Sequence, residues 1–191
     1  MRLLALKQHI NTAIFTNTDL AKLFPEESGN QINTQVYRMI KRGDLIGIKR
    51  GIYLFPEVDI DEFVIANRIY TPSYVSLESA LNIYGIIPDY ASNITSITTT
   101  TTKNIKTQKH TFLYSKISRL LYFGFENVID SNSGLYYQLA LPEKALLDYI
   151  YIRKIKSLSE NRVDTSGLNK QVFANFAVHF PKWVSKVITS E

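Results

Sequence analysis

Apolar residues recur in the first third of the chain with the period of helices. In the longest of these segments, Ile32, Val36 and Ile40 recur every fourth residue with Met39 beside them, so one face of the helix is apolar. Gly43 follows where a C-terminal cap is expected. The pattern predicts helices over residues 2–13, 16–24 and about 31–42.

After the third helix, the apolar spacing shortens to that of β-strands. Apolar residues in 45–48 and 52–55 predict two strands, and a Lys-Arg-Gly turn at residues 49–51 joins them. Helices followed by a basic hairpin are the element order of a winged helix-turn-helix. We therefore predict this fold for residues 1–56, with a domain boundary inside the proline-bearing, acidic segment 56–61.

The remainder of the chain mixes both periods, which predicts an α+β domain over residues 57–191 that ends in a helical tail. Ser76 precedes one helix as an expected N-cap, and Pro142 and Glu143 are typical of the first turn of another. Predicted helices cover residues 62–70, 77–84, 142–153, 168–178 and 181–189. Predicted strands cover residues 94–102, 111–115, 120–125 and 135–140.

The composition of the 191 residues is that of a globular protein, with 45% hydrophobic and 20% charged residues. No apolar run approaches the roughly 18 residues of a membrane helix, and the opening MRLLALKQHI is too quickly polar for a signal peptide. The absence of cysteine excludes disulfides, thiol catalysis and cysteine–zinc sites. We expect a cytoplasmic protein with no membrane partner.

Positive charge is concentrated near the predicted hairpin. The net charge is +5, and residues 1–56 hold eight basic and four acidic residues, whereas residues 57–191 hold fourteen and thirteen. Five of the first eight cations fall between Arg38 and Arg50. A local excess of this kind is typical of a surface that binds nucleic acid.

The polar face of the predicted helix 31–42 offers the side chains that read DNA. Amides and guanidinium groups pair with base edges in the major groove, while cations at the helix end and hairpin tip neutralise phosphates. An ordinary solvated helix face and a basic hairpin tip are the alternative interpretation of these residues. The residues predicted to lie nearest base edges are Gln31, Thr34, Gln35 and Arg38. Those predicted to contact phosphates or the minor groove are Lys41, Arg42, Lys49 and Arg50.

Four blocks of sequence also resemble one known family. FTNTDLAKLF, YRMIKRGDLIGIKRGIYLFP, PSYVSLESALNIYGI and LALPEKALLDYIY are similar to the AbiEi antitoxins of type IV toxin–antitoxin (abortive infection) systems, in the order of that family, from Phe15 to Tyr151. The resemblance implies a winged helix-turn-helix transcriptional regulator that represses its own operon. It also implies a second domain that counteracts a nucleotidyltransferase-type toxin encoded nearby. Residues from Ser157 onward match none of these blocks.

Two copies on an inverted-repeat operator in the chain's own promoter are expected, as a homodimer or a cooperative pair, because one winged module usually binds DNA weakly. Residues 57–191 would then hold the partner or set the spacing of the pair. The alternatives are a stand-alone transcriptional regulator and a protein-interaction module, both without a toxin partner. In the tail, Trp183 belongs to an apolar face that packs on the domain or contacts a partner.

The sequence supports no enzyme motif. The three histidines lie one per region, and neither a Walker loop, a GxSxG elbow nor a GxGxxG loop is present, so no catalytic residue, metal or cofactor is predicted. Lys144 and Asp148 are four residues apart on a predicted helix and are expected to form a weakly stabilising pair. With Glu143, and Asp89 as a further carboxylate, they could instead belong to the centre of an enzyme that acts on nucleic acid.

Overall fold

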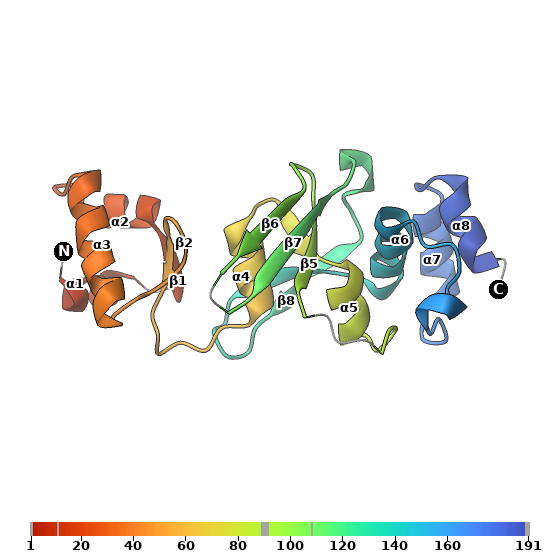
Figure 1. The fold of residues 1–191 in the computed structure, drawn as a ribbon, viewed down its shortest axis with the longest axis horizontal. Coiled ribbons are helices and arrows are strands. Elements are labelled where there is room, and N and C mark those ends of the chain that lie inside the picture. The colour runs from red at the N-terminus through yellow and green to blue at the C-terminus, as the bar shows by residue number, and fades with distance from the viewer. Residues whose placement is uncertain (1, 11, 89–91, 108, 190–191) are drawn as a thin grey trace. The chain divides into compact units, whose positions relative to one another are not determined.

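A computed structural model describes residues 2–10, 12–88, 92–107 and 109–189 of the chain. It divides into two compact units, residues 1–61 with 131–134 and residues 62–130 with 135–191. The first unit carries a three-stranded sheet and the second a six-stranded sheet, each with helices (Figure 1). The α+β class predicted from the sequence is confirmed.

The first unit combines helices with a small antiparallel sheet of strand order β1-β3-β2. Its helices are α1 (Leu3–His9), α2 (Asn17–Leu23) and α3 (Gly29–Arg42), and its strands are β1 (Ile14–Thr16), β2 (Ile46–Lys49) and β3 (Ile52–Leu54). The predicted helix 2–13 is too long and β1 was not predicted. Ile14 pairs with Leu54 of β3, and Ile14 and Phe15 are both buried, so a partner from far along the chain decides their conformation.

Side chains fix the helix ends of the first unit. Thr16 caps α2 in a capping box with Asp19, and Ser28 caps α3 in a capping box with Gln31. Gly43 ends α3 with a φ of 81°, as the sequence predicts. The buried faces of these helices meet β1 and β3 in one core, which contains Leu6, Phe15, Leu20, Ile32, Val36, Met39, Leu45 and Tyr53.

The second unit is built on a mixed sheet of strand order β6-β7-β5-β4-β9-β8, in which β4 runs parallel to β9 and β5 runs parallel to β7. Its strands are β4 (Ser73–Val75), β5 (Ile94–Thr98), β6 (Lys103–Lys106), β7 (Thr111–Lys116), β8 (Phe125–Ile129) and β9 (Tyr136–Ala140). Its helices are α4 (Glu62–Ile69), α5 (Leu77–Ile83), α6 (Pro142–Arg153), α7 (Lys170–Ala177) and α8 (Lys182–Thr189), with short 3-10 turns η1 (Arg119–Leu121) and η2 (Ser159–Asn161).

Several strand predictions in this unit were wrong. The predicted strand 94–102 ends at Thr98, whose hydroxyl donates to the Pro72 carbonyl and bonds Thr100, which turns the chain before β6 begins. Residues 120 and 121 of the predicted strand 120–125 lie in the turn η1, because the Ser118 hydroxyl accepts from the Leu120 N–H and starts a 3-10 helix, and strand β8 begins only at Phe125. The three-residue β4 was not predicted.

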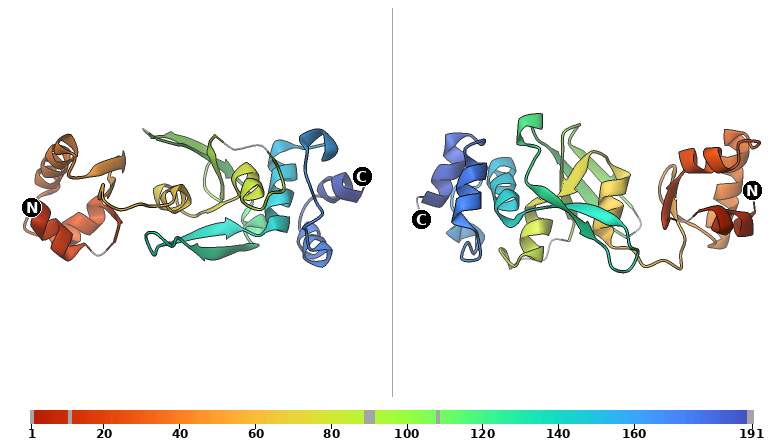
Figure 2. Two further views of the ribbon diagram at one scale, coloured as in Figure 1. Left: turned by 90° about the horizontal axis from the view of Figure 1, so that it is seen from below. Right: turned by 180° about the vertical axis from the view of Figure 1, so that it is seen from behind.

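Helix α6 lies between the sheet and the tail helices α7 and α8 (Figures 1 and 2). Near its N-terminus, the Glu143 carboxylate accepts a hydrogen bond of 2.7 Å from the backbone N–H of Asn169, the N-cap of α7. Farther along α6, Tyr151 contacts the rings of Phe180 and Trp183. The tail therefore packs on α6. Among the described residues, no helix has the length and apolar character needed to cross a lipid bilayer.

Replacing Tyr122 with phenylalanine is expected to leave the second unit as stable at pH 7, or more stable by up to about 1 kcal/mol. The Tyr122 hydroxyl is buried with no partner among the described residues, while its ring packs on Tyr74 at a centroid distance of 5.1 Å, a contact that phenylalanine retains. Urea unfolding followed by Trp183 emission measures this, since Trp183 is the one tryptophan in the sequence. A loss above 1 kcal/mol would contradict the expectation.

Tyr122→Phe should lose less stability than the wild-type protein when the pH is raised above 10. Burial raises the pKa of Tyr122 to about 12, above the value of about 10 expected in the unfolded chain. The contribution of the neutral phenol is therefore fully present below pH 10 and is lost as the pH rises from 10 to 12. Unfolding in urea at pH 7 and pH 11 should show a smaller difference for Tyr122→Phe than for wild type.

Alanine at Gly51 is expected to destabilise the first unit by about 1–2 kcal/mol, because Gly51 has a φ of 82° at the turn of the β2–β3 hairpin. Gly29 is the matched control, since it lies in α3 at ordinary φ and a Cβ there meets no atom within 4 Å. Hydrogen exchange of the hairpin amides should therefore accelerate in Gly51→Ala and not in Gly29→Ala. Equal exchange in the two variants would refute the strain argument.

Candidate functional site

The exposed face of α3 holds all the predicted DNA-contacting residues of that helix. Ile32, Val36 and Met39 point into the core, and the opposite side is polar. On it, Gln31, Thr34, Arg38, Lys41 and Arg42 are exposed and Gln35 is half-buried. The structure thus places these six side chains along one solvent-facing surface.

Three of the predicted base-reading side chains also have local partners. Gln31 Oε1 accepts from the Ser28 N–H at 2.7 Å and Gln35 Nε2 donates to Glu27 Oε2 at 2.8 Å, so both amides help to fix the start of α3. Thr34 Oγ1 donates to the Asn30 carbonyl at 2.9 Å. Arg38 forms no hydrogen bond or ion pair with any described residue, so its guanidinium is available to a ligand.

The remaining predicted cations differ in how far they are neutralised. Arg42 pairs with Asp44, with its Nη2 2.7 Å from Oδ2, so its charge is partly balanced. Lys41 lies over the ring of Tyr37, 5.6 Å from the centroid. Lys49 and Arg50 are exposed at the hairpin tip, and Arg50 has no ion-pair partner in the part of the chain that the structure describes.

Asn17 connects the hairpin tip to both neighbouring helices. Its backbone N–H donates to the Gly51 carbonyl at 3.1 Å, and its side-chain Nδ2 donates to Asn33 Oδ1 on α3 at 3.1 Å. The tip that carries Arg50 is thereby held at the N-terminus of α2, which also contacts Asn33 of α3. The contacts of Asn17 were not predicted, because nothing local in the sequence marks a contact with residues 33 and 51.

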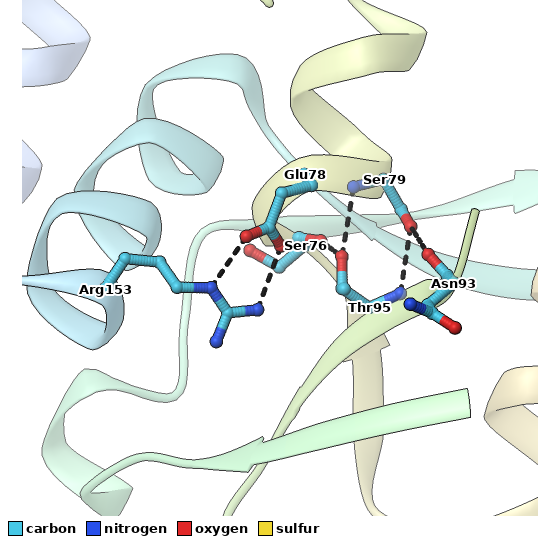
Figure 3. A network of polar contacts seen from close by, with 6 residues as sticks. All are labelled: Ser76, Glu78, Ser79, Asn93, Thr95 and Arg153. Carbon is cyan, nitrogen blue, oxygen red and sulfur yellow. Dashed lines mark hydrogen bonds and ion pairs between the residues drawn. The ribbon is translucent and has the colours of Figure 1, made fainter. Parts of the chain in front are cut away.

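A polar pocket of about 390 Å³ lies in the second unit, beside α5 and the C-terminal end of α6. Arg153 forms two hydrogen bonds with the Glu78 carboxylate, of 2.6 and 3.0 Å, at its edge (Figure 3). Next to this pair, Thr95 Oγ1 donates to the Ser76 carbonyl and accepts from the Ser79 N–H, while Ser79 Oγ bonds Asn93 and Thr95 backbone groups. These polar groups satisfy one another and tie α5 to β5.

Lys144 and Asp148 form the ion pair that their spacing predicts, and both side chains are fully buried. Lys144 Nζ also donates to the Tyr74 hydroxyl at 2.7 Å, and the hydroxyls of Tyr74 and Ser76 donate to Asp148 Oδ2, each at 2.9 Å. The Ser76 side chain makes no capping hydrogen bond to α5, because its hydroxyl faces Asp148. The hydroxyls of Tyr74 in β4 and of Ser76 directly after it thus complete a polar cluster with Lys144 and Asp148 of α6.

Aromatic rings enclose the Lys144 ammonium. Its Nζ lies 5.2 Å from the ring centroid of Tyr74, 5.4 Å from Phe123 and 5.2 Å from Phe180. Burial lowers the pKa of Lys144 and raises the pKa of Asp148, while their mutual attraction opposes both shifts. The cluster therefore joins sheet, α6 and tail in a dry environment.

The nuclease interpretation gains no support from this cluster. Lys144 and Asp148 have no exposed side-chain surface, and no group of three His, Cys, Asp or Glu able to hold a metal occurs among the described residues. Asp89, the further carboxylate considered from the sequence, lies outside the described residues.

Comparison with known proteins identifies no relative: no protein-family model matches the chain, and no curated protein matches it significantly.

Proposed function

We propose that residues 1–56 form a winged helix-turn-helix that binds double-stranded DNA and represses transcription from the chain's own promoter. The observation that carries this proposal is the placement of two exposed arginines without ion-pair partners among the described residues, Arg38 on α3 and Arg50 at the hairpin tip. Asn17 links the hairpin tip to Asn33 of α3, so the hairpin that carries Arg50 and the helix that carries Arg38 are held together. A separate solvated helix would need no such link.

In the proposed complex α3 enters the major groove, where Arg38 pairs with the O6 and N7 of a guanine. Gln31, Thr34 and Gln35 lie along the same face. Gln31 Nε2 and Thr34 Oγ1 would lie toward neighbouring base edges, whereas Gln35 Oε1 is buried and only the Nε2 that bonds Glu27 could reach one. Lys41, Arg42, Lys49 and Arg50 contact phosphates or the adjoining minor groove. Two copies bind an inverted repeat.

We further propose that the protein is a cytoplasmic antitoxin of the AbiEi type, without catalysis of its own, that counteracts a nucleotidyltransferase-type toxin encoded nearby. The resemblance of the blocks between Phe15 and Tyr151 supports this role. Without a neighbouring toxin gene, the same surface would serve a stand-alone regulator.

Fluorescence anisotropy with the chain's own promoter and a scrambled duplex, over a series of salt concentrations, tests DNA binding. We expect the promoter to be preferred by about 10³-fold or more, with log affinity falling linearly with log salt. Equally poor binding of both duplexes at physiological salt would rule out repression and favour a protein-interaction module.

Co-expression with the gene next to that of this chain tests the antitoxin role separately. If that gene alone arrests growth, the full chain should restore it, and a variant that has lost promoter binding should still restore it when expressed from an unrelated promoter. Failure of both forms to restore growth would leave a regulator without antitoxin activity.

A further inference from the structure

A mainly apolar groove of about 600 Å³ lies between the end of α6 and the tail helix α8. Its apolar lining comes from Ile155, Trp183 and Val187, and 41% of the Trp183 surface is exposed. Tyr151 on α6 stacks against the Trp183 ring with centroids 6.1 Å apart and an angle of 25° between planes. The indole is thus held in place at the edge of the groove before any ligand arrives, which lowers the entropy lost on binding.

The rim of this groove is basic. Within the described part of the chain, its lining contains Lys154, Lys156 and Lys186 and no carboxylate. The surrounding segment shares this bias, since residues 154–189 hold six basic and two acidic residues. This excess was not predicted, because the acidic residues of 57–153 balance the positive charge of the tail when residues 57–191 are counted together.

We propose that this groove binds an acidic segment of a partner protein that inserts a bulky apolar side chain against Trp183. An exposed, oriented aromatic beside apolar residues is typical of the energetic centre of a protein interface, and charged residues are typical of its rim. Carboxylates on the partner would face Lys154 and Lys156 and select it by charge complementarity. The proposal does not depend on DNA binding by residues 1–56.

The apolar lining favours a polypeptide over the other anionic macromolecules. A DNA duplex presents phosphates to such a surface and no apolar group to fill the space beside Ile155 and Val187. An anionic membrane would be expected to contact a wider apolar face than one tryptophan and two aliphatic side chains. Both remain outcomes of the test below.

Emission from Trp183 reports directly on this groove, since the chain contains a single tryptophan. The probe is a helical peptide of about 15 residues with leucines at i, i+3, i+4 and i+7 and glutamates elsewhere, free of tryptophan. We expect it to shift the emission of the full-length protein to shorter wavelength as the indole loses water. Two control peptides match this probe: one has lysine in place of every glutamate, and the other has serine in place of every leucine.

Charge-reversal variants locate the binding. Lys154→Glu and Lys156→Glu should each weaken binding of the acidic peptide by about 10-fold. Lys170→Glu, the same change on α7 outside the groove lining, should alter this binding by less than about 2-fold. Unchanged far-UV circular dichroism shows that each variant is folded.

Four results would overturn the proposal. They are an equal shift with the lysine peptide, an equal shift with the serine peptide, no shift with the acidic peptide up to about 1 mM, and equal binding by Lys156→Glu and wild type. A shift caused only by single-stranded DNA or by vesicles of phosphatidylserine and phosphatidylcholine would reassign the groove to those ligands.

Discussion

Replacing Asp148 with alanine is expected to destabilise the second unit by about 3–5 kcal/mol. Asp148 accepts hydrogen bonds from Lys144, Tyr74 and Ser76, and all of these side chains are buried. Alanine would leave the Lys144 ammonium without its counter-ion in a site that water does not reach. The Tyr74 and Ser76 hydroxyls would lose their acceptor as well.

Urea unfolding followed by Trp183 emission measures this loss in the second unit. Glu126→Ala is the matched control, because Glu126 is an exposed carboxylate on β8 of the same unit, and its loss should change stability by less than about 0.5 kcal/mol. A cost below 1 kcal/mol for Asp148→Ala would show that the ammonium finds water and that the cluster is not closed.

The double variant Lys144→Met/Asp148→Leu separates the ion pair from the packing around it. Removal of both charges should be less destabilising than Asp148→Ala alone, because no unpaired charge remains and methionine keeps contacts with Phe123 and Phe180. A double variant that is less stable than Asp148→Ala would mean that the attraction outweighs the desolvation of the pair.

The Lys144–Asp148 pair also shows where sequence reasoning fails. Spacing on a helix correctly placed both residues one turn apart on α6, and Pro142 correctly marked the start of that helix. Spacing could not show that the pair is buried, because the hydroxyls that satisfy it come from residues 74 and 76. Long-range contacts of this kind leave no periodic signal.

The same distinction applies to the first unit. Gly43 and the apolar face of α3 are local features, and both were predicted correctly. The starts of β2 and β3 came within one residue of the prediction for the same reason. Strand β1 was missed because three residues are too few for a period, and its pairing with β3 spans some forty residues of sequence.

For the predicted DNA-contacting residues, the sequence was sufficient to place side chains on the surface but not to identify their partners. The period of α3 was sufficient to place Arg38 on the solvent face, and a Lys-Arg-Gly turn was sufficient to place Arg50 at a hairpin tip. The sequence could not show that Arg42 pairs with Asp44 or that Gln31 closes a capping box. Because Arg42 and Gln31 have such partners and Arg38 and Arg50 have none among the described residues, substitutions of Arg38 and Arg50 test DNA binding most directly.

Alanine at Arg38 is expected to weaken promoter binding by about 10- to 100-fold and to reduce discrimination between the promoter and a scrambled duplex. A guanidinium that pairs with a base edge carries sequence information, so its loss affects the correct site more than random DNA. Alanine at Arg50 should instead weaken binding to both duplexes by the same factor. It should also reduce the slope of log affinity against log salt by about one unit.

Arg119→Ala is the control for this comparison, because it removes the same charge from an exposed position in the second unit. Its affinity for both duplexes should stay within about 2-fold of wild type, since an exposed charge that makes no contact with DNA is screened at physiological salt. If Arg38→Ala and Arg50→Ala behave like Arg119→Ala, α3 and the hairpin do not contact DNA. The first unit would then act as a protein-docking module, which needs neither arginine. If all three variants weaken binding equally, association follows net charge alone and no surface on the first unit reads sequence.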